Sequence, residues 1–386
     1  MSMYNNAMFE RRTKDIITQN EDLELLFTFE KFPVLMTCTN QDQSLDVKAN
    51  LEFAISKSSG MVQGLNLADL DFLYSEAHVS GVLGNIWKNH HKSFADFIHK
   101  YNRKNIIEIG GQHGILYNSY KELNENFKWT IIDPDPTDDI DSEVNVIRGF
   151  FDEDTIIDPE SDCIVHSHFF EHLYDPNKFL EKISNVLCDK MMIFSTPNLD
   201  QWFKNNYSQT LTFEHTYLFN EYYVKKLLSQ NSLEIIDMKY YCNEHSIFYA
   251  VRYNPNMKEI ENEDYYNENK KAFSNFIQYK KNIISNINEF TKSEKFYIFG
   301  AHVNTQFLIN LGLDTKNLIC LLDNSDFKQN KRLYGTNLYV KKPSVLEDDL
   351  NAVVIVDTGK YNEEIISTLL EKYPHLKAYS LDSFDK

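Results

Sequence analysis

The chain is poor in the residues that mark fibrous, disordered or disulfide-stapled proteins. Its 386 residues include 12 glycines and 9 prolines, too few for a collagen-like or low-complexity protein. The five cysteines are scattered and form no CxxC pair. This spacing argues against a disulfide framework and fits a reducing compartment. We therefore expect a cytoplasmic protein with ordinary apolar cores.

Positive charge and long apolar runs are also scarce. Lys and Arg total 39 against 57 Asp and Glu, which gives a formal net charge of −18. Such an acidic chain lacks electrostatic support for binding nucleic acid or an anionic membrane. No segment approaches the roughly 20 apolar residues of a membrane span, and residues 1–26 have no apolar core of signal-peptide length. The sequence predicts a protein that acts on small molecules, with neither nucleic acid nor membrane as a partner.

What the chain does contain is an alternation of strand and helix patterns. Strand-like "NIIEIG", "FKWTIID", "DCIVHSH" and "KMMIFSTPN" alternate with amphipathic helix patterns such as "PNKFLEKISNVL", which has Pro176 in its first turn. Two more strands, "LEIIDMKYYC" and "HSIFYAVRY", follow as a pair. Units of this kind predict an α/β fold with a doubly wound, mostly parallel sheet and an antiparallel edge.

The patterns divide the chain into three regions. Residues 1–75 are short mixed segments, and residues 76–255 hold the alternation described above. Residues 256–386 begin with a charged, Asn-rich linker that leads into a helix at about 270–290. A second α/β run follows, with "KFYIFG", "NLICLLDNS" and "AVVIVDTGKYNEEI". We expect a small N-terminal domain and two Rossmann-like domains in series.

The end of the first central strand carries the most specific motif. In "NIIEIGGQHGIL", residues 105–116, an acid and three glycines follow the strand. A dinucleotide fingerprint G-x-G-x-x-G fails here, because positions 112 and 115 hold Gln and Ile. The stretch instead resembles the first motif of class I S-adenosylmethionine methyltransferases, acid-x-Gly-x-x-x-Gly. That resemblance implies S-adenosyl-L-methionine as the cofactor, held by Glu108, Gly110, Gly111, Gln112 and Gly114.

Further motifs follow in the order usual for class I methyltransferases. Asp133 ends the next strand, 25 residues after Glu108. An acid there can accept hydrogen bonds from ribose hydroxyls, although it also begins a turn before Pro134. Phe150 and Phe151 come after a third strand, where an aromatic face suits the adenine ring. His168, after the fourth strand, is a further candidate for the cofactor site or for a donor to a substrate oxygen.

Over nearly the whole chain the sequence resembles a narrower group, the sugar C-methyltransferases that act on nucleotide-linked deoxysugars. "EIGGQHG" is similar to that family's E-I-G-S-N-D-G. "FYIFGAHVNTQFLINLGL", "LLDNSDFKQNKRLYGTNLYV" and "GKYNEEI" resemble its own Rossmann-like C-terminal domain. The resemblance implies a small zinc-binding domain over residues 1–75, a methyltransferase domain over 76–255 and the C-terminal domain over 256–386.

The predicted zinc-binding domain departs from the family pattern. Family members hold zinc with two pairs of cysteines, whereas this region has only Cys38 and reads "SKSSG" where a CxxCG is expected. One thiolate cannot assemble a four-coordinate structural zinc site. We therefore expect a degenerate zinc-ribbon-like domain without metal, in which apolar packing replaces the ion.

The resemblance also implies a catalytic set. The family places a histidine base beside a glutamate in a Y-x-E-H pattern, and "LTFEHTYLF" keeps Glu214 and His215 with Thr212 for the tyrosine. His172 in "FFEHLYDP" matches a second family histidine, and His78 in "SEAHVSG" stands where another tyrosine is expected. A histidine suits the role of base because its unperturbed pKa lies near neutrality.

Together the motifs predict an S-adenosylmethionine-dependent methyltransferase, and the family resemblance implies a nucleotide-linked keto-deoxysugar as its substrate. The expected reaction is C-methylation beside a keto group, with His215 as the base. O-methylation of a sugar in surface-glycan synthesis is an alternative, as is a non-catalytic binding protein. Glu214 and His215 also suit a surface pair, and His172 suits a turn-shaping role. The sequence leaves open the sugar, the nucleotide, the position methylated and the oligomeric state.

Overall fold

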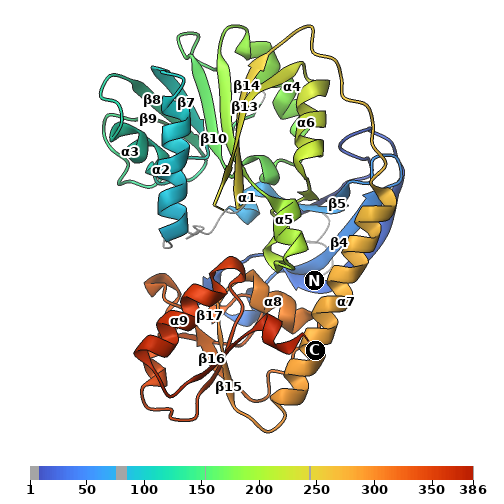
Figure 1. Cartoon of the computed structure of the whole chain (residues 1–386), viewed down its shortest axis with the longest axis vertical. Coiled ribbons are helices and arrows are strands. Elements are labelled where there is room, and N and C mark those ends of the chain that lie inside the picture. The colour runs from blue at the N-terminus through green and yellow to red at the C-terminus, as the bar shows by residue number, and fades with distance from the viewer. Residues whose placement is uncertain (1–7, 75–84, 153, 243–244, 386) are drawn as a thin grey trace.

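A computed structural model of the protein describes residues 8–74, 85–152, 154–242 and 245–385 (Figure 1). Its central sheet has the strand order β13-β14-β11-β10-β7-β8-β9. Neighbours pair in parallel except β14, which is antiparallel to both β11 and β13. The predicted doubly wound α/β fold with an antiparallel edge is confirmed. The strands are β7 (Asn105–Ile109), β8 (Lys128–Asp133), β9 (Asn145–Arg148), β10 (Cys163–Ser167), β11 (Met191–Pro197), β13 (Leu233–Tyr241) and β14 (Ser246–Tyr253).

Helices cover both faces of this sheet. α2 (Asn85–His99) and α3 (Ile115–Lys121) pack on one face, and α4 (Pro176–Leu187) and α6 (Glu221–Gln230) pack on the other (Figure 1). β11 is buried along its whole length, as expected of a strand covered on both sides. α4 begins as the sequence predicts, because Pro176 fixes its first turn and the Asp175 carboxylate accepts the backbone N–H groups of Asn177 and Lys178.

The N-terminal region is built on an antiparallel sheet rather than on a cluster of thiolates. Its strand order is β12-β5-β4-β2, and a separate pair, β1 with β6, lies beside it. Phe29, Phe53 and Phe276 belong to the apolar cluster that this sheet buries against α7 (Tyr266–Phe290). The elements are β1 (Phe9–Arg11), β2 (Leu23–Pro33), β4 (Lys48–Ser56), β5 (Val62–Gly64), β6 (Asn66–Ala68), α1 (Leu70–Leu73) and β12 (Tyr217–Leu218).

β12 joins this sheet to the central region. It follows the Glu214–His215 segment in the chain, yet it pairs with β5 of the N-terminal sheet, Tyr217 opposite Gln63. Cys38 is buried in β3 (Cys38–Thr39), and its thiol contacts the carbonyl oxygen of Ala301 at 3.7 Å. The metal-free state and the division at residues 75 and 255 remain predictions.

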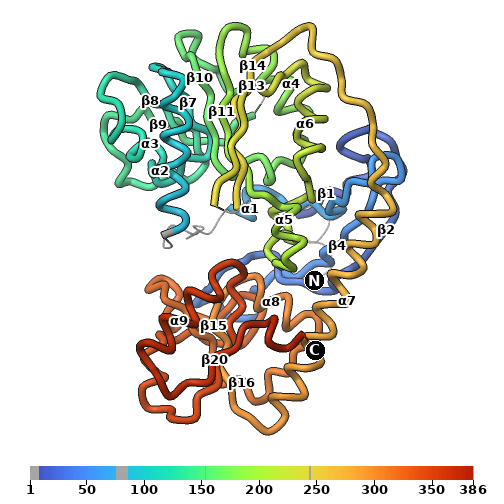
Figure 2. Tube along the Cα trace, in the orientation of Figure 1, coloured from blue at the N-terminus to red at the C-terminus, as the bar shows by residue number. Residues whose placement is uncertain are grey.

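The C-terminal unit is a parallel sheet with the order β18-β16-β15-β19-β20. α7 leads into it and runs beside β2 and β4 from the upper to the lower part of the molecule (Figure 2). The β17–β3 pair ties this unit to the N-terminal region. Its elements are β15 (Phe296–Phe299), α8 (Val303–Asn310), β16 (Leu318–Leu322), β17 (Arg332–Leu333), β18 (Val340–Lys341), β19 (Val353–Val356), α9 (Asn362–Lys372) and β20 (Lys377–Ser380).

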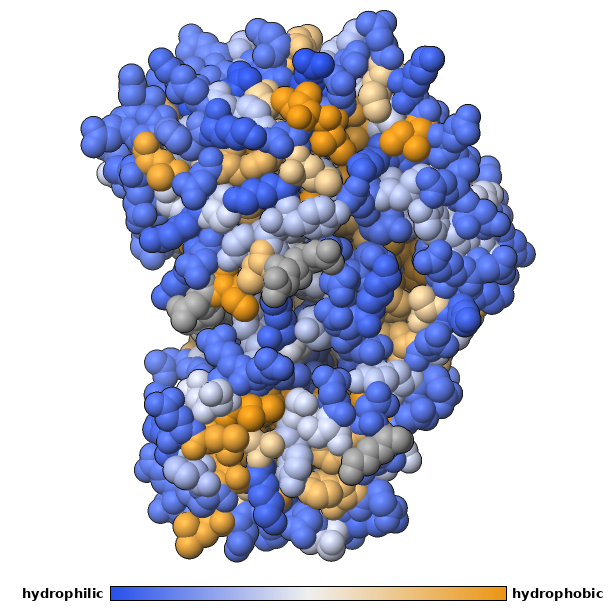
Figure 3. Space-filling view, in the orientation of Figure 1, coloured by the Kyte–Doolittle hydropathy of each residue, from blue (hydrophilic) through white to orange (hydrophobic). Residues whose placement is uncertain are grey.

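The surface gives no sign of a large apolar patch on the face drawn in Figure 3. That face is mainly hydrophilic, and its apolar residues form small separate groups. Among the described residues, no helix combines the length and the apolar character that a membrane crossing requires.

Candidate functional site

The glycine loop between β7 and α3 takes a backbone shape that favours glycine. Gly110 has φ +77° and Gly114 has φ +61°, both in the left-handed region. Gly114 caps α3 without a side-chain hydrogen bond, so the first N–H groups of this short helix face the loop. A Cβ at Gly110 would make only ordinary contact, 3.6 Å from the ring of Phe169. The backbone is therefore bared at the carboxyl end of β7.

Gly111 packs directly against the buried side chain of Glu108. A Cβ at this position would lie 2.7 Å from Cδ of Glu108, so the buried carboxyl group folds over Gly111. Glu108 also accepts a hydrogen bond from Trp129 Nε1 at 2.8 Å. Burial raises the pKa of Glu108 to about 7, and the Trp129 hydrogen bond opposes part of this shift. The contact with Glu108 thus explains Gly111, whereas the expected contact of both residues with the cofactor remains a prediction.

Asp133 lies beside the glycine loop because β8 pairs with β7. Its Oδ1 accepts the backbone N–H of Asp135 at 2.8 Å, and burial raises its pKa. The carbonyl oxygen of Gln112 accepts the N–H of Thr137 at 2.9 Å, which fixes the loop against the segment after β8. The carboxylate and the bared loop meet at the carboxyl ends of neighbouring parallel strands, where ligands of doubly wound sheets bind.

The two phenylalanines after β9 have different surroundings. The ring of Phe151 packs edge-on against Phe179 with centroids 5.6 Å apart, and the Lys182 ammonium lies 4.8 Å from its centroid. Phe150 lies 6.3 Å from the ring of Tyr74 and is only partly buried. Of the two predicted adenine contacts, Phe150 is the one placed toward the histidines described below.

The chemical groups at the ends of β7, β8 and β9 suit the parts of S-adenosylmethionine. The carboxylate of Asp133 can accept hydrogen bonds from ribose hydroxyls, and the bared loop can approach the amino-acid part of the cofactor. A Cβ on Gly149, directly after β9, would meet nothing within 4 Å, so the third strand end is open as well. The cofactor, when bound, supplies a methyl group on a sulfonium.

His168 belongs to a separate cluster of rings. Its Nε2 lies 3.0 Å from Ser246 Oγ and its Nδ1 lies 3.5 Å from Glu171 Oε1. The rings of Trp87 and His90 lie 4.6 and 5.0 Å from it. Burial lowers its pKa far below the usual value, so the ring is neutral at pH 7. Its two nitrogens face Ser246 and Glu171; its predicted role at the cofactor remains untested.

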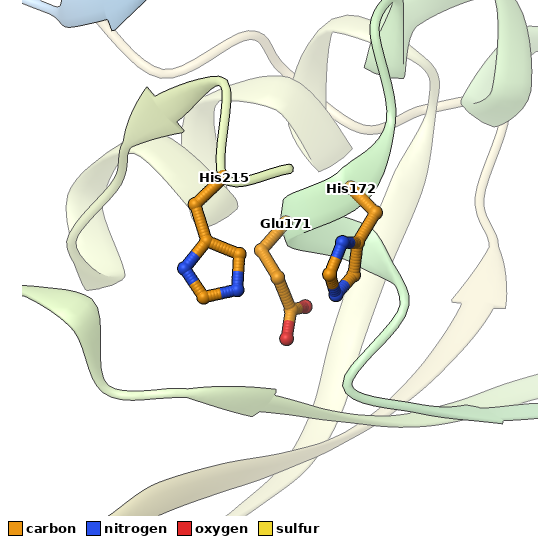
Figure 4. A group of neighbouring side chains, drawn as sticks. All are labelled: Glu171, His172 and His215. Atoms are coloured by element: carbon orange, nitrogen blue, oxygen red, sulfur yellow. The ribbon is translucent and has the colours of Figure 1, made fainter. Parts of the chain in front are cut away.

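The predicted catalytic side chains Glu214, His215 and His172 come together beyond the carboxyl end of β10. The rings of His172 and His215 have centroids 5.0 Å apart, and His172 Nδ1 lies 3.9 Å from Glu214 Oε2. Figure 4 shows His172 and His215 on either side of Glu171. The hydroxyl of Tyr74 lies 3.3 Å from His172 Nδ1. His172 ends the 3₁₀ turn η2 (Phe170–His172) that follows β10.

The segment that carries Glu214 and His215 is held by Thr212. The hydroxyl oxygen of Thr212 accepts the backbone N–H of His215 at 2.9 Å and that of Glu214 at 3.2 Å. Thr212 is buried. It therefore shapes the turn and does not take over the hydroxyl position that the family's tyrosine is expected to provide.

Arg12 connects the two segments that carry His172 and His215. Its guanidinium is buried and donates to the carbonyl oxygens of Gly64 at 3.0 Å, Thr216 at 2.8 Å and Tyr174 at 2.7 Å. Thr216 follows His215, and Tyr174 comes two residues after His172. Burial lowers the pKa of Arg12 to about 10, so the group stays charged at pH 7. One side chain from the N-terminal region thus spans two loops of the central one.

Burial also sets the protonation of the side chains that are predicted to be catalytic. It lowers the pKa of His215 to about 4, against a smaller opposing effect from the backbone of Gln209. His215 is therefore neutral at pH 7 and has a lone pair to accept a proton. Burial raises the pKa of Tyr74 well above its usual value, so its hydroxyl keeps its proton.

Sequence reasoning missed three members of the site. Tyr74 lies four residues before His78, which the sequence analysis placed at the tyrosine position and which lies outside the described residues. Glu171 stands next to His172 and was passed over. Arg12 is 160 residues away from His172 in the chain, and no local pattern points to its role.

Comparisons with known proteins agree with the central fold. Residues 86–237 match a protein family described as a methyltransferase domain. Similar solved structures include the mitomycin 7-O-methyltransferase MmcR (15% identity, 44% of this chain and 55% of that one, TM-score 0.37). Another is human N-acetylserotonin methyltransferase in complex with SAM (16% identity, 44% and 53%, TM-score 0.38). No curated protein matches the chain.

The structural similarities are distant, and this chain spans little more than half the length of those two solved chains. They do not bear on substrate or mechanism. The family match covers the glycine loop, Asp133, His172 and the Glu214–His215 pair. The match therefore indicates methyl-transfer chemistry for the region of residues 86–237.

Proposed function

We propose that the protein is an S-adenosylmethionine-dependent methyltransferase that methylates the carbon beside the keto group of a nucleotide-linked deoxysugar. The observation that carries this proposal is the neutral, half-buried His215, whose ring lies 5.0 Å from that of His172. A neutral imidazole can accept the proton of a C–H bond that a neighbouring keto group has made acidic. Tyr74 and His172 stand beside it as donors for the oxygen on which negative charge develops.

In this reaction each side chain has one task. His215 takes the proton from carbon, and Glu214 stabilises the charged imidazoles nearby. The hydroxyl of Tyr74, protonated at neutral pH, donates to the enolate oxygen directly or through His172. The carbon then displaces the sulfur from the methyl group in line, which requires that the two ligands be held close together. Asp133 and the glycine loop hold the cofactor for that step.

O-methylation of a sugar is the second candidate, and Thr212 favours it. Its hydroxyl oxygen accepts two backbone N–H groups of its own turn. It therefore does not supply the enolate donor that the tyrosine of the family pattern is expected to supply. A hydroxyl acceptor needs a base but no enolate donor.

Proton exchange separates the two reactions. A keto-deoxysugar nucleotide is incubated with the enzyme in deuterated buffer, without S-adenosylmethionine, and exchange at the carbon beside the keto group is followed by NMR. C-methylation predicts exchange that the His215→Gln variant loses and the exposed His99→Gln control keeps. Methyl transfer from labelled cofactor without any such exchange would instead assign the reaction to oxygen.

The remaining parts of the proposal concern the setting of the enzyme. We place it in the cytoplasm, where nucleotide-linked sugars are built and where its five cysteines stay reduced. The C-terminal unit, residues 256–386, is proposed to help grip the substrate. Its loop after β15 has one glycine where a dinucleotide site would need three.

A further inference from the structure

Glu171, His172 and His215 form a cluster that the proposed reaction uses only in part. One carboxylate oxygen and one nitrogen of each ring lie within 4.8 Å of one another. In Figure 4 the Glu171 carboxylate lies between the two imidazole rings. Across the described ranges of the chain, this is the one group of three histidine, cysteine, aspartate or glutamate side chains that approaches so closely.

Two of the atoms in this cluster are buried without a hydrogen bond. Glu171 is 1% exposed, and its Oε2 has no hydrogen-bond partner among the described residues. Nδ1 of His215 is likewise buried and has none within the same set of residues. A buried polar atom left unpaired costs about 1–3 kcal/mol. Both atoms can offer a lone pair, and they belong to segments that are 44 residues apart in the chain.

We propose that Glu171, His172 and His215 bind one divalent transition-metal ion. Two imidazoles and a carboxylate suit ions such as Zn²⁺ or Co²⁺, and three protein ligands leave at least one position for water or a substrate oxygen. Ligand atoms about 2.1 Å from an ion lie at most about 4.2 Å apart. Because the three atoms are already within 4.8 Å, small side-chain rotations bring them to that distance.

The fold holds the two segments of this site in place. The Tyr217 hydroxyl donates to the carbonyl oxygen of Phe170 at 2.5 Å and so fixes the turn that carries Glu171 and His172. Thr212 fixes the His215 turn through two backbone N–H groups. The ion thus meets ligands that are largely in position, which lowers the entropic cost of binding.

A bound ion has a consequence for the reaction. An imidazole that coordinates a metal through Nδ1 carries its proton on Nε2, so metal-bound His215 has no lone pair left for a substrate proton. We therefore expect the ion to inhibit proton abstraction. Binding itself does not depend on the proposed function, because the ligands are the same whatever the substrate is.

Cobalt(II) titration tests the site on the full chain without a histidine tag. Visible absorption from a four- or five-coordinate Co²⁺ should grow and saturate at one equivalent. Glu171→Gln and His215→Gln should each weaken binding about tenfold or more, since even residues that only support metal ligands commonly matter that much. His99→Gln, an exposed histidine at the far end of α2, should leave the titration unchanged.

The controls separate loss of the site from loss of the fold. Each variant is checked by its thermal midpoint and by calorimetric binding of S-adenosylmethionine, both of which should stay near the wild-type values. The proposal is overturned if wild-type protein gives no saturable absorption, or if both variants bind Co²⁺ as tightly as wild type. Neither result affects the proton-exchange experiment described above. The metal site and the proposed reaction are therefore tested independently.

Discussion

Glu108 shows how a single buried carboxyl group makes the stability of the fold depend on pH. It is 3% exposed, and its pKa of about 7 lies above the value of about 4.3 expected in the unfolded chain. Between these two values the folded protein keeps a proton that the unfolded chain has lost. Stability therefore falls as pH rises from about 4.3 to about 7, and stays reduced above that range.

Glu108→Gln removes this dependence, because the amide is neutral at every pH and its oxygen can still accept the Trp129 N–H bond. At pH 8 we expect the variant to unfold with a free energy higher by about 1–3 kcal/mol. At pH 4 the difference should vanish. Chemical unfolding at the two pH values measures it. A variant less stable than wild type at pH 8 would contradict the burial argument.

Tyr74 is the residue whose removal should affect catalysis most selectively. Tyr74→Phe keeps the ring beside Phe150 and removes the hydroxyl that lies 3.3 Å from His172 Nδ1. Loss of one donor to a developing oxyanion lowers kcat by about 100-fold, while the affinity for S-adenosylmethionine should not change. Tyr240→Phe, an exposed tyrosine on β13, is the matched control. Equal kcat values for the two variants would show that the Tyr74 hydroxyl has no part in catalysis.

At the scale of elements, the loops after β10 and before β12 are placed by a residue that belongs to neither. Arg12→Met leaves the carbonyl oxygens of Gly64, Tyr174 and Thr216 without their buried donor. We expect the free energy of unfolding to fall by about 3 kcal/mol and kcat to fall while cofactor affinity is kept.

The neighbouring arginine provides the control for that prediction. Arg11 pairs with Glu52, but its side chain is 52% exposed. An exposed pair contributes at most about 1 kcal/mol, so Arg11→Met should leave both stability and kcat close to wild type. If Arg12→Met were as mild as Arg11→Met, the loops that carry His172 and His215 would have to be held by their own hydrogen bonds alone.

At the scale of the whole molecule, the N-terminal and C-terminal regions share buried contacts. Arg332 donates both guanidinium nitrogens to the Asp46 carboxylate at 2.6 Å, and the two side chains are 5% and 1% exposed. The backbone N–H of Val47 donates to the Tyr334 hydroxyl at 2.5 Å. These contacts predict that the two regions unfold together.

Asp46→Asn tests that coupling. It leaves the Arg332 guanidinium buried without its counter-charge, which we expect to cost about 3–5 kcal/mol. Calorimetric unfolding should show one transition for these two regions, shifted to lower temperature. Asp326→Asn breaks an ion pair with Lys342, in which the Asp326 and Lys342 side chains are 85% and 58% exposed. It should leave the temperature of this transition unchanged. Two separate transitions in the Asp46 variant would show that the regions unfold independently.

The sequence predicted what depends on local patterns. The order of strands around the glycine loop, the α4 helix that begins at Pro176 and the closing strand pair all follow from periodicity and caps that lie within a few residues of each other. The convergence of His172 with Glu214 and His215 followed from a family resemblance. Contacts made across the fold escaped prediction: nothing near Arg12 in the sequence indicates Tyr174 or Thr216, and nothing near Cys38 indicates a strand pairing with Arg332 and Leu333.

The whole proposal depends on the glycine loop and Asp133 holding S-adenosylmethionine at the carboxyl ends of β7 and β8. Calorimetric titration of the cofactor into wild-type protein and Asp133→Asn tests it directly. We predict micromolar binding by the wild type and an affinity about tenfold lower or more in the variant, because a hydrogen bond to a charged group contributes about 1.5–3 kcal/mol. Equal binding by the two proteins, or none by the wild type, would contradict the claim.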